Sequence, residues 1–255
     1  NLGVFDDRRY FEAGTGSLVF EVGGARCAVT ICEDLWHAGP YERAVEQGAE
    51  LVINLNASPF HGGKADERAA VIRARQQYRP VPVVYVNLVG GQDEVVYDGS
   101  SCAVAADGGL AVRAPAFEDG LYPVEFERTG GVLSPVSAAV ADAVSEPGST
   151  YAALVRGTRD YLHASGFDRA VLGLSGGIDS AVVAAIAVDA LGAGQVHAVM
   201  LPSRYTSAHS LEDAEACAGL LGIRYSTLSI EPLFESARGV LTDLFDGLDE
   251  DVTEE

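Results

Sequence analysis

The first third of the chain alternates apolar runs with amphipathic segments. The runs "ARCAVTIC" (25–32) and "LVINLNA" (51–57) predict strands, and "VPVVYVNLV" (81–89) is apolar nearly throughout, as strands buried on both faces are. Between these runs, residues 41–50 predict a short helix and residues 64–79 an amphipathic one. Strands that alternate with helices indicate an α/β fold.

The pattern changes after residue 90. Residues 100–114 hold two apolar runs around Asp107-Gly108-Gly109, which predicts a hairpin. Residues 121–126 predict an edge strand, because the proline among them cannot donate to a strand ladder. Residues 129–150 are rich in Gly, Ser, Ala and Pro without a sustained amphipathic period, so they predict a linker.

A second alternating series follows the predicted linker. Its first element is a helix over residues 153–166. Three strands and two intervening helices come next, the strands at 170–174, 196–201 and 224–230 and the helices near 179–191 and 210–221. This spacing predicts right-handed crossovers and a parallel sheet. We therefore expect one domain over 1–128, the linker over 129–150 and a second domain over 151–255.

Composition narrows the class of protein. The 255 residues, 48% of them hydrophobic, are enough for two modest folded domains. The net charge of −20 argues against a nucleic-acid partner, and no apolar stretch reaches the length that suggests a membrane span. Four cysteines without metal-type or disulfide-framework spacing indicate reduced thiols in a cytoplasmic protein. Because the chain begins without Met and stops on "DVTEE", we expect a fragment cut at both ends.

The stretch "VLGLSGGIDSAVV" (171–183) joins a predicted strand to a predicted helix through small and polar residues. Helix N-termini offer unpaired N–H groups and a partial positive charge, so an anion is stabilised there. Gly176 and Gly177 allow close approach of the backbone, and Ser175 and Ser180 add hydroxyl donors. Asp179 would repel a phosphate unless it holds a Mg²⁺ ion that bridges to one. A helix cap with two turn glycines is the simpler interpretation, but the flanking strand, helix and Asp-Ser pair favour a phosphate site.

This stretch is similar to the SGGxDS signature of the ATP pyrophosphatase superfamily, which splits ATP between its α and β phosphates. Together with "VHAVMLPSRYTS" and "DVTEE", it resembles the synthetase domain of the NAD synthetase family. The resemblance implies ATP and deamido-NAD as substrates, with Mg²⁺ held by Asp179. The implied ATP-binding residues are Gly173, Leu174, Ser175, Gly176, Gly177, Ile178, Asp179 and Ser180.

Cys32 ends an apolar strand in the first half and is followed at once by Glu33 and Asp34. A cysteine in such a place is most often a small core residue. A nucleophilic thiol needs an adjacent base or cation, and neighbouring carboxylates favour the neutral thiol. From these residues alone, both roles stay open.

The context of Cys32 resembles the nitrilase-like glutaminase domain of the glutamine-dependent NAD synthetase family. The stretches that carry this resemblance are "GVFDDRRYF", "CEDLW", "INLNASPFHGGK" and "YVNLVGGQDEVVYDGSS", in this order. The resemblance implies a Glu–Lys–Cys triad with Cys32 as nucleophile, Ser58 and Lys64 on glutamine-binding positions, and Leu2 where an aromatic residue is common. The family's Glu and Lys precede the cysteine, so we expect both before Asn1 and expect the chain alone to be inactive.

The resemblances imply the C-terminal part of a nitrilase-like α-β-β-α sandwich, followed by the start of a Rossmann-like parallel-sheet ATP-pyrophosphatase domain. They imply a glutamine-hydrolysing NAD synthetase that is a homo-oligomer at full length. In this reaction ATP adenylates deamido-NAD, and ammonia from glutamine displaces AMP to give NAD. Three alternatives stay open: an ATP-pyrophosphatase amidotransferase with another acceptor, a non-catalytic nucleotide-binding relative, and a stand-alone amidase.

Overall fold

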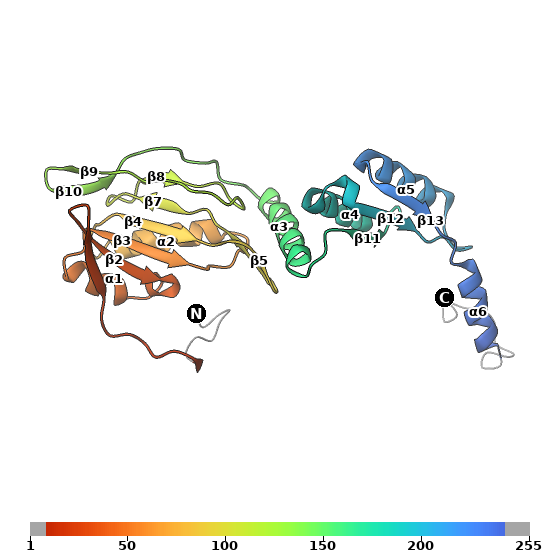
Figure 1. Ribbon diagram of the computed structural model, residues 1–255, viewed down its shortest axis with the longest axis horizontal. Helices are drawn as coiled ribbons and strands as arrows, with labels where there is room; N and C mark the ends of the chain where they lie inside the picture. Colours follow the sequence, from red (N-terminus) through yellow and green to blue (C-terminus); the bar gives the residue numbers. More distant parts are fainter. Residues whose placement is uncertain (1–8, 243–255) are drawn as a thin grey trace. The chain divides into compact units, whose positions relative to one another are not determined.

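The computed structural model describes residues 9–242, which divide into two compact units with the boundary between Gly157 and Thr158 (Figure 1). The boundary falls inside helix α3 (Gly148–Ala164). Each unit has its own sheet and its own core. Among the described residues, no helix is long and apolar enough to cross a membrane.

The first unit is built on a six-stranded sheet in the order β1-β2-β3-β4-β7-β8. Its strands are β1 (Leu18–Val22), β2 (Ala25–Ile31), β3 (Leu51–Asn56), β4 (Val83–Asn87), β7 (Cys102–Val104) and β8 (Leu110–Arg113). The strands β2, β3 and β4 run parallel, and the remaining pairs are antiparallel. The structure confirms the three strands predicted within 25–89 and the hairpin predicted at 100–114.

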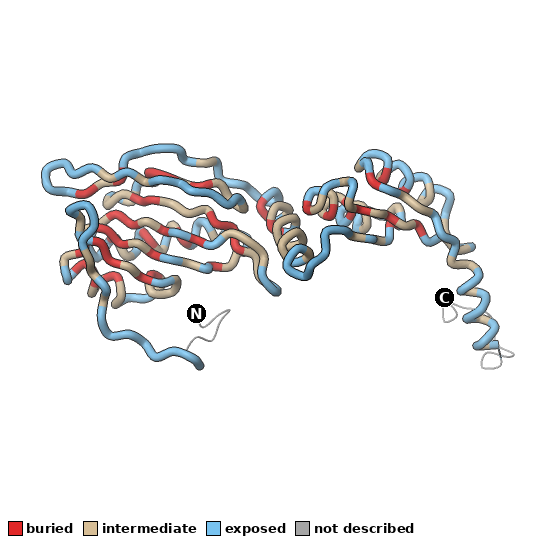
Figure 2. The backbone as a smooth tube through the Cα atoms, in the orientation of Figure 1, coloured by how far each residue is buried: buried red, intermediate tan, exposed pale blue. Residues whose placement is uncertain are grey.

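Helices α1 (Pro40–Glu46) and α2 (Lys64–Gln76) connect the parallel strands and cover one face of the sheet. Right-handed crossovers in succession place both helices on the same side. Tyr41 from α1 and Ile72 from α2 are almost completely buried there, against Val52 and Val83 of the strands. Figure 2 shows how the buried positions concentrate in these strands.

The opposite face of the sheet is only partly covered. A hairpin of β9 (Phe126–Thr129) and β10 (Val132–Pro135) packs Leu133 against Cys27 and Leu51. Farther along the same face, the apolar side chains of Ile31, Leu55 and Val86 lie in register and remain 66%, 45% and 41% exposed.

The β9–β10 hairpin corrects two predictions. Residues 121–125 form no strand, so the edge strand predicted over 121–126 is wrong, and residues 132–135 inside the predicted linker form β10. Gly130 and Gly131, at φ +60° and +86°, make a two-residue turn between strands, a signal that the sequence analysis did not weigh. Residues 138–141 then hydrogen-bond to β8, so this stretch is fastened to the sheet.

A two-stranded ribbon of β5 (Val89–Gln92) and β6 (Val95–Asp98) follows β4 and was also not predicted. The main-chain N–H of Phe60 donates to the Val96 carbonyl at 2.7 Å. The ribbon thereby brings Asp98 back to the loop that follows β3.

The second unit holds a parallel sheet of β11 (Ala170–Gly173), β12 (Val196–Met200) and β13 (Arg224–Thr227), in that order. The remaining elements of this unit are α4 (Ile178–Leu191), η3 (Ala193–Gln195), α5 (Ala208–Leu221) and α6 (Glu231–Leu241). Buried alanines of α4 and α5 pack with the strands, because small side chains let the helices approach the sheet closely. The predicted parallel α/β series is confirmed.

Replacing Ile72 by alanine tests the core of the first unit. Ile72 is 1% exposed, so Ile72→Ala should lower the free energy of unfolding of this unit by about 2–5 kcal/mol. Leu121→Ala is the control, since Leu121 is 98% exposed and its loss should cost less than about 0.5 kcal/mol. Urea unfolding, followed by the fluorescence of Trp36, the one tryptophan of the sequence, measures the free energy of unfolding of both variants. An equal loss of that free energy in the two variants would contradict the packing described here.

Candidate functional site

Cys32 lies at the carboxyl end of β2, where it begins the short 3-10 helix η2 (Cys32–Leu35). Its φ of +45° is in the left-handed region, which costs a non-glycine residue about 1–3 kcal/mol and persists only where the surroundings enforce it. Here two hydrogen bonds hold the backbone, one at the preceding residue and one at the Cys32 carbonyl. Asp34 accepts a hydrogen bond from the Ile31 N–H at 2.9 Å, and the Asn54 side-chain amide donates to the Cys32 carbonyl at 3.5 Å.

The two acids beside Cys32 have other partners. Glu33 Oε1 lies 3.2 Å from His37 Nε2, and Asp34 is bonded to the turn itself. Lys64 Nζ lies 4.1 Å from the centroid of the ring of Trp36, the residue that follows η2. The Lys64 side chain is 15% exposed and also contacts Glu67 at 3.2 Å. Lys64 is thereby held beside Trp36, at the end of the short helix that Cys32 begins.

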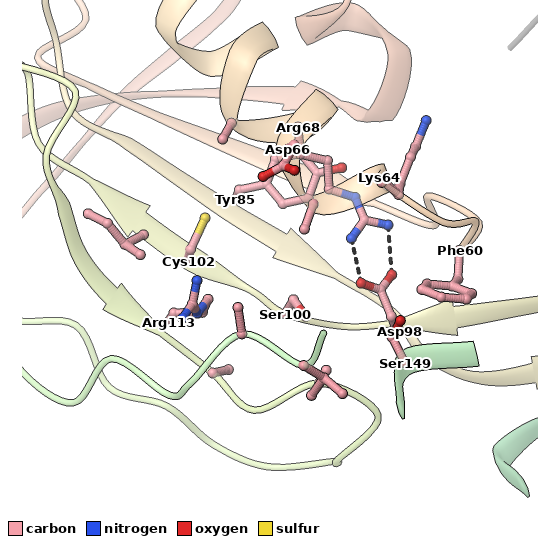
Figure 3. A pocket seen from close by; sticks show the side chains of 18 of the residues that line it. Phe60, Lys64, Asp66, Arg68, Tyr85, Asp98, Ser100, Cys102, Arg113 and Ser149 are labelled. Carbon is pink, nitrogen blue, oxygen red and sulfur yellow. Dashed lines mark hydrogen bonds and ion pairs between the residues drawn. The ribbon is translucent and has the colours of Figure 1, made fainter. Parts of the chain in front are cut away.

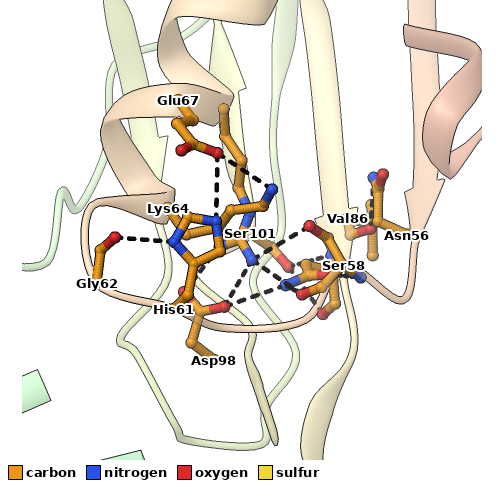
Figure 4. Close-up of polar contacts among 11 residues, drawn as sticks. Asn56, Ser58, His61, Gly62, Lys64, Glu67, Val86, Asp98 and Ser101 are labelled. Carbon is orange, nitrogen blue, oxygen red and sulfur yellow. Dashed lines mark hydrogen bonds and ion pairs between the residues drawn. The ribbon is translucent and has the colours of Figure 1, made fainter. Parts of the chain in front are cut away.

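Ser58 follows β3 at the same edge of the sheet and is 3% exposed. Its N–H donates to Asn87 Oδ1 and its carbonyl accepts from Arg68 Nη2, each at 2.9 Å. Figure 4 shows the polar contacts of Ser58 and, separately, those of Lys64 with Glu67. The glutamine-binding positions implied by the resemblance thus lie at the two ends of one segment, 58–64, which runs from the loop after β3 to the first residue of α2.

Tyr85 of β4 lies beside Arg68, whose Cζ is 5.9 Å from the centroid of the Tyr85 ring. Burial raises the pKa of Tyr85 to about 12. The pKa of Tyr97 is also raised, first by burial. Both tyrosines are therefore buried, neutral phenols at neutral pH.

A cavity of about 490 Å³ lies beside this network in the first unit. Figure 3 shows Arg68 and Asp98 paired in its wall, with Cys102 and Arg113 across from them. Burial raises the pKa of Cys102 to about 11, so this thiol is unreactive at neutral pH. Cys102 therefore behaves as a packing residue, and Cys32 is not part of this cavity wall.

The sequence analysis missed four residues of this network: Asn54, Arg68, Asn87 and Asp98. A signal was present for the two asparagines, since each interrupts an apolar strand at a position that is buried in the fold. Arg68 stands on the inward side of an amphipathic helix, which is equally unusual. Leu2 and "DVTEE" lie outside the described residues.

In the second unit, the predicted phosphate loop lies exposed between β11 and α4, and Gly177 is the N-cap of that helix. Ser180 Oγ donates to the Gly177 carbonyl at 2.9 Å and lies 3.1 Å from Ser175 Oγ. The Gly177 N–H lies 3.3 Å from Ser175 Oγ. Leu174 differs from its neighbours, because its side chain is buried in the core and its N–H donates to the Val199 carbonyl.

Gly176 is required by a contact that the sequence analysis did not identify. Its φ is +81°, and a Cβ atom at this residue would lie 2.3 Å from the Ser210 carbonyl oxygen in the first turn of α5. The loop therefore brings the N-termini of α4 and α5 close together. Two helix N-termini add their partial positive charges, which favours a phosphate group between them.

Asp179 lies in the first turn of α4 and is exposed. The described residues contain no cluster of three or more His, Cys, Asp or Glu side chains that could hold a metal by themselves. Mg²⁺ is commonly bound by one or two carboxylates together with substrate phosphates and water, so a single carboxylate beside a phosphate loop fits that ion.

The loop after β12 is held against helix α6. Arg204 binds Glu231 through its main-chain N–H at 2.9 Å and its Nε at 2.5 Å, and its guanidinium also pairs with Glu235. Tyr205 contacts Phe234 edge to face, at 5.7 Å between ring centroids. These residues fasten α6 to the loop.

Known proteins match both units. The profile of the carbon-nitrogen hydrolase family matches residues 3–130, and that of the NAD synthase family matches residues 150–252. The chain is 46% identical over 255 residues to the glutamine-dependent NAD(+) synthetase of Rhodobacter capsulatus, which covers 99% of this chain and 46% of that protein. The counterpart in Acinetobacter baylyi is 41% identical over 256 residues, or 100% of this chain and 47% of that protein.

A solved structure of glutamine-dependent NAD+ synthetase from Acinetobacter baumannii, in complex with ADP, matches with a TM-score of 0.93 and 40% identity. The match covers 99% of this chain and 48% of that one. The chain thus spans about half the length of the curated relatives it matches. These matches agree with the resemblances found in the sequence motifs. The chain belongs to the carbon-nitrogen hydrolase family through residues 3–130, and an NAD synthase domain follows over residues 150–252.

Proposed function

We propose that the full-length protein is a glutamine-hydrolysing NAD synthetase. It forms NAD, AMP, diphosphate and glutamate from deamido-NAD, ATP and glutamine. The observation that carries the proposal is the segment 175–180, which runs from the loop after β11 into the first turn of α4 and lies beside the N-terminus of α5. The direct experiment incubates the full-length protein with Mg-ATP, deamido-NAD and glutamine, and assays NAD. Absence of NAD formation with either glutamine or ammonia would overturn the proposal.

In the glutaminase half, the Cys32 thiolate attacks the carboxamide carbon of glutamine. Ammonia leaves, and water then hydrolyses the thioester to release glutamate and restore the thiol. Ser58 and Lys64 bind the polar ends of glutamine. We propose that the triad's Glu and Lys precede Asn1 in the full-length protein, the Glu transferring protons and the Lys stabilising the oxyanion. The strained backbone of Cys32 at the carboxyl end of β2 supports this role.

In the synthetase half, the deamido-NAD carboxylate attacks the α-phosphorus of ATP and diphosphate leaves. Ammonia then displaces AMP from the adenylate to give NAD. The N–H and hydroxyl groups of Ser175, Gly176, Gly177 and Ser180 would bind the diphosphate, and Asp179, in the first turn of α4, would hold Mg²⁺. The ion, when bound, neutralises charge on the phosphate oxygens. Gly173, Leu174 and Ile178 complete the ATP-binding segment.

The details of the two domain folds, the cellular location and the oligomeric state are carried over from the resemblance. We propose a Rossmann-like pyrophosphatase domain and a nitrilase-like sandwich whose second sheet covers the apolar row of Ile31, Leu55 and Val86. We also propose that the protein is cytoplasmic and a homo-oligomer. The four cysteines lie among the described residues and form no disulfide, which supports a reducing compartment.

Cys32→Ala tests the nucleophile in the full-length protein. Glutamine-dependent NAD synthesis should fall by more than about 10³-fold because no thioester can form, whereas ammonia-dependent synthesis should persist. Cys27→Ala is the matched control, since Cys27 is a buried core residue of the same strand region. Retention of glutamine use in Cys32→Ala would exclude Cys32 as nucleophile.

Asp179→Ala tests the metal ligand. Both glutamine-dependent and ammonia-dependent synthesis should fall by about 10²–10³-fold, because the charge on the phosphates is no longer neutralised. Asp168→Ala removes an exposed carboxylate just before β11, at the opposite end of that strand, and should leave both rates unchanged. Equal rates for the two variants would refute the role of Asp179. The assay is NAD formation at saturating ammonia.

Gly176→Ala tests the geometry of the phosphate loop. The added methyl would lie 2.3 Å from the Ser210 carbonyl oxygen, so the loop must shift and deamido-NAD-dependent ATP–diphosphate exchange should fall by about 10²-fold. Gly219→Ala, in α5 with nothing within 4 Å of its new Cβ atom, should exchange normally. Normal exchange in Gly176→Ala would show that the loop conformation does not control ATP chemistry.

A further inference from the structure

The main chain of Ser58 is held at both of its polar groups by side chains from other segments. Its N–H donates to Asn87 Oδ1 at 2.9 Å, and its carbonyl accepts from Arg68 Nη2 at 2.9 Å. Asn87 Nδ2 also lies 3.4 Å from the same carbonyl oxygen. Loop backbone is usually solvated, so this double attachment restrains Ser58 unusually tightly.

Arg68 is itself fixed by Asp98 through a two-pronged ion pair. Arg68 Nη1 and Nη2 each lie 2.7 Å from a different carboxylate oxygen of Asp98 (Figure 3). Arg68 is 5% exposed and Asp98 is 4% exposed. Burial alone would lower the pKa of Arg68, but its hydrogen bonds with Asp98 raise that pKa above its ordinary value. The planar fork directs one remaining Nη2–H group at the Ser58 carbonyl.

Stability alone is a poor explanation of this pair. Desolvation of both charges offsets most of their attraction, and buried ion pairs are often replaceable by apolar side chains. Helix α2 also carries an ion pair between Arg75 and Glu42 at 3.0 Å, which fastens it to α1. The side chains of Arg75 and Glu42 are both partly exposed, and the hydrogen bond between them involves neither Ser58 nor Lys64. What distinguishes Arg68 is its bond to Ser58.

We propose that Arg68 is a positioning residue for glutamine recognition, acting through the main chain of Ser58 and the loop 58–64. The inference rests on the proposed glutaminase function. Arg68 and Asn87 each bond to Ser58, and Asn87 Nδ2 also lies 3.5 Å from Asp98 Oδ1; Ser58 and Asp98 are labelled in Figure 4. Cys32 is oriented separately by Asn54 and Asp34, so loss of the Arg68 contact changes glutamine binding more than the chemical step.

Arg68→Lys in the full-length protein tests the inference. Lysine keeps the charge but lacks the fork, so it cannot bind both Asp98 oxygens and the Ser58 carbonyl. The KM for glutamine should rise about 10-fold, the effect of losing one charge-assisted hydrogen bond, while kcat and ammonia-dependent synthesis stay near their original values. Arg75→Lys makes the same exchange on the same helix and should leave the KM for glutamine unchanged.

Asn87→Ala tests the same attachment without leaving a buried charge unpaired. It removes the acceptor of the Ser58 N–H and should also raise the KM for glutamine. This variant decides the question if Arg68→Lys does not fold. An unchanged KM in Asn87→Ala, or equal effects of Arg68→Lys and Arg75→Lys, would overturn the inference.

Hydrogen exchange of the peptide that contains residues 57–63 tests the positioning role of Arg68 independently of the proposed glutaminase function. The exchange should be faster in Arg68→Lys than in Arg75→Lys, whether or not glutamine is hydrolysed. Equal exchange would overturn the positioning role even in an active enzyme. Failure of the unmodified protein to use glutamine would instead refute the proposed glutaminase function.

Discussion

The parallel pairing of β2, β3 and β4 is the constraint on which the first unit depends. Their register aligns Ile31 with Leu55 and Leu55 with Val86, so all three strands end at one edge of the sheet. Cys32 follows the first strand and the Ser58 loop follows the second. Because side chains alternate between faces along a strand, a shift of one residue would turn the polar groups of the site toward the opposite face.

Polar side chains inside an apolar layer must find partners, and here most of these partners lie in the loops of the site. Asn54 donates to Thr30 and Cys32, and Asn87 and Arg68 bond to Ser58. A buried polar group without a hydrogen bond is costly, so each of these contacts restrains the loop that supplies it. The second unit reaches a similar restraint by different means. There a glycine and several alanines allow helices, strands and the phosphate loop to approach closely.

Much of the element order could be predicted because hydrophobic periodicity reports which face of a local segment is buried. That logic correctly identified the strands and helices on both sides of the phosphate loop and the parallel strands around Cys32. It failed between 121 and 135, where apolar content was read as a strand and small residues as a linker. The two-residue turn at Gly130-Gly131 defines the hairpin there, and turn geometry is not expressed in periodicity.

The sequence by itself determined that Cys32 ends a strand and that Ser175 to Ser180 joins a strand to a helix, because both follow from neighbouring residues. It also determined the chemical character of each loop. Only the tertiary structure decided that Arg68 and Asp98, separated by 30 residues, would meet at Ser58, and that Ser210 would require a glycine at position 176. Local patterns encode which face is buried, whereas the partner across that face depends on how distant segments are brought together by the fold.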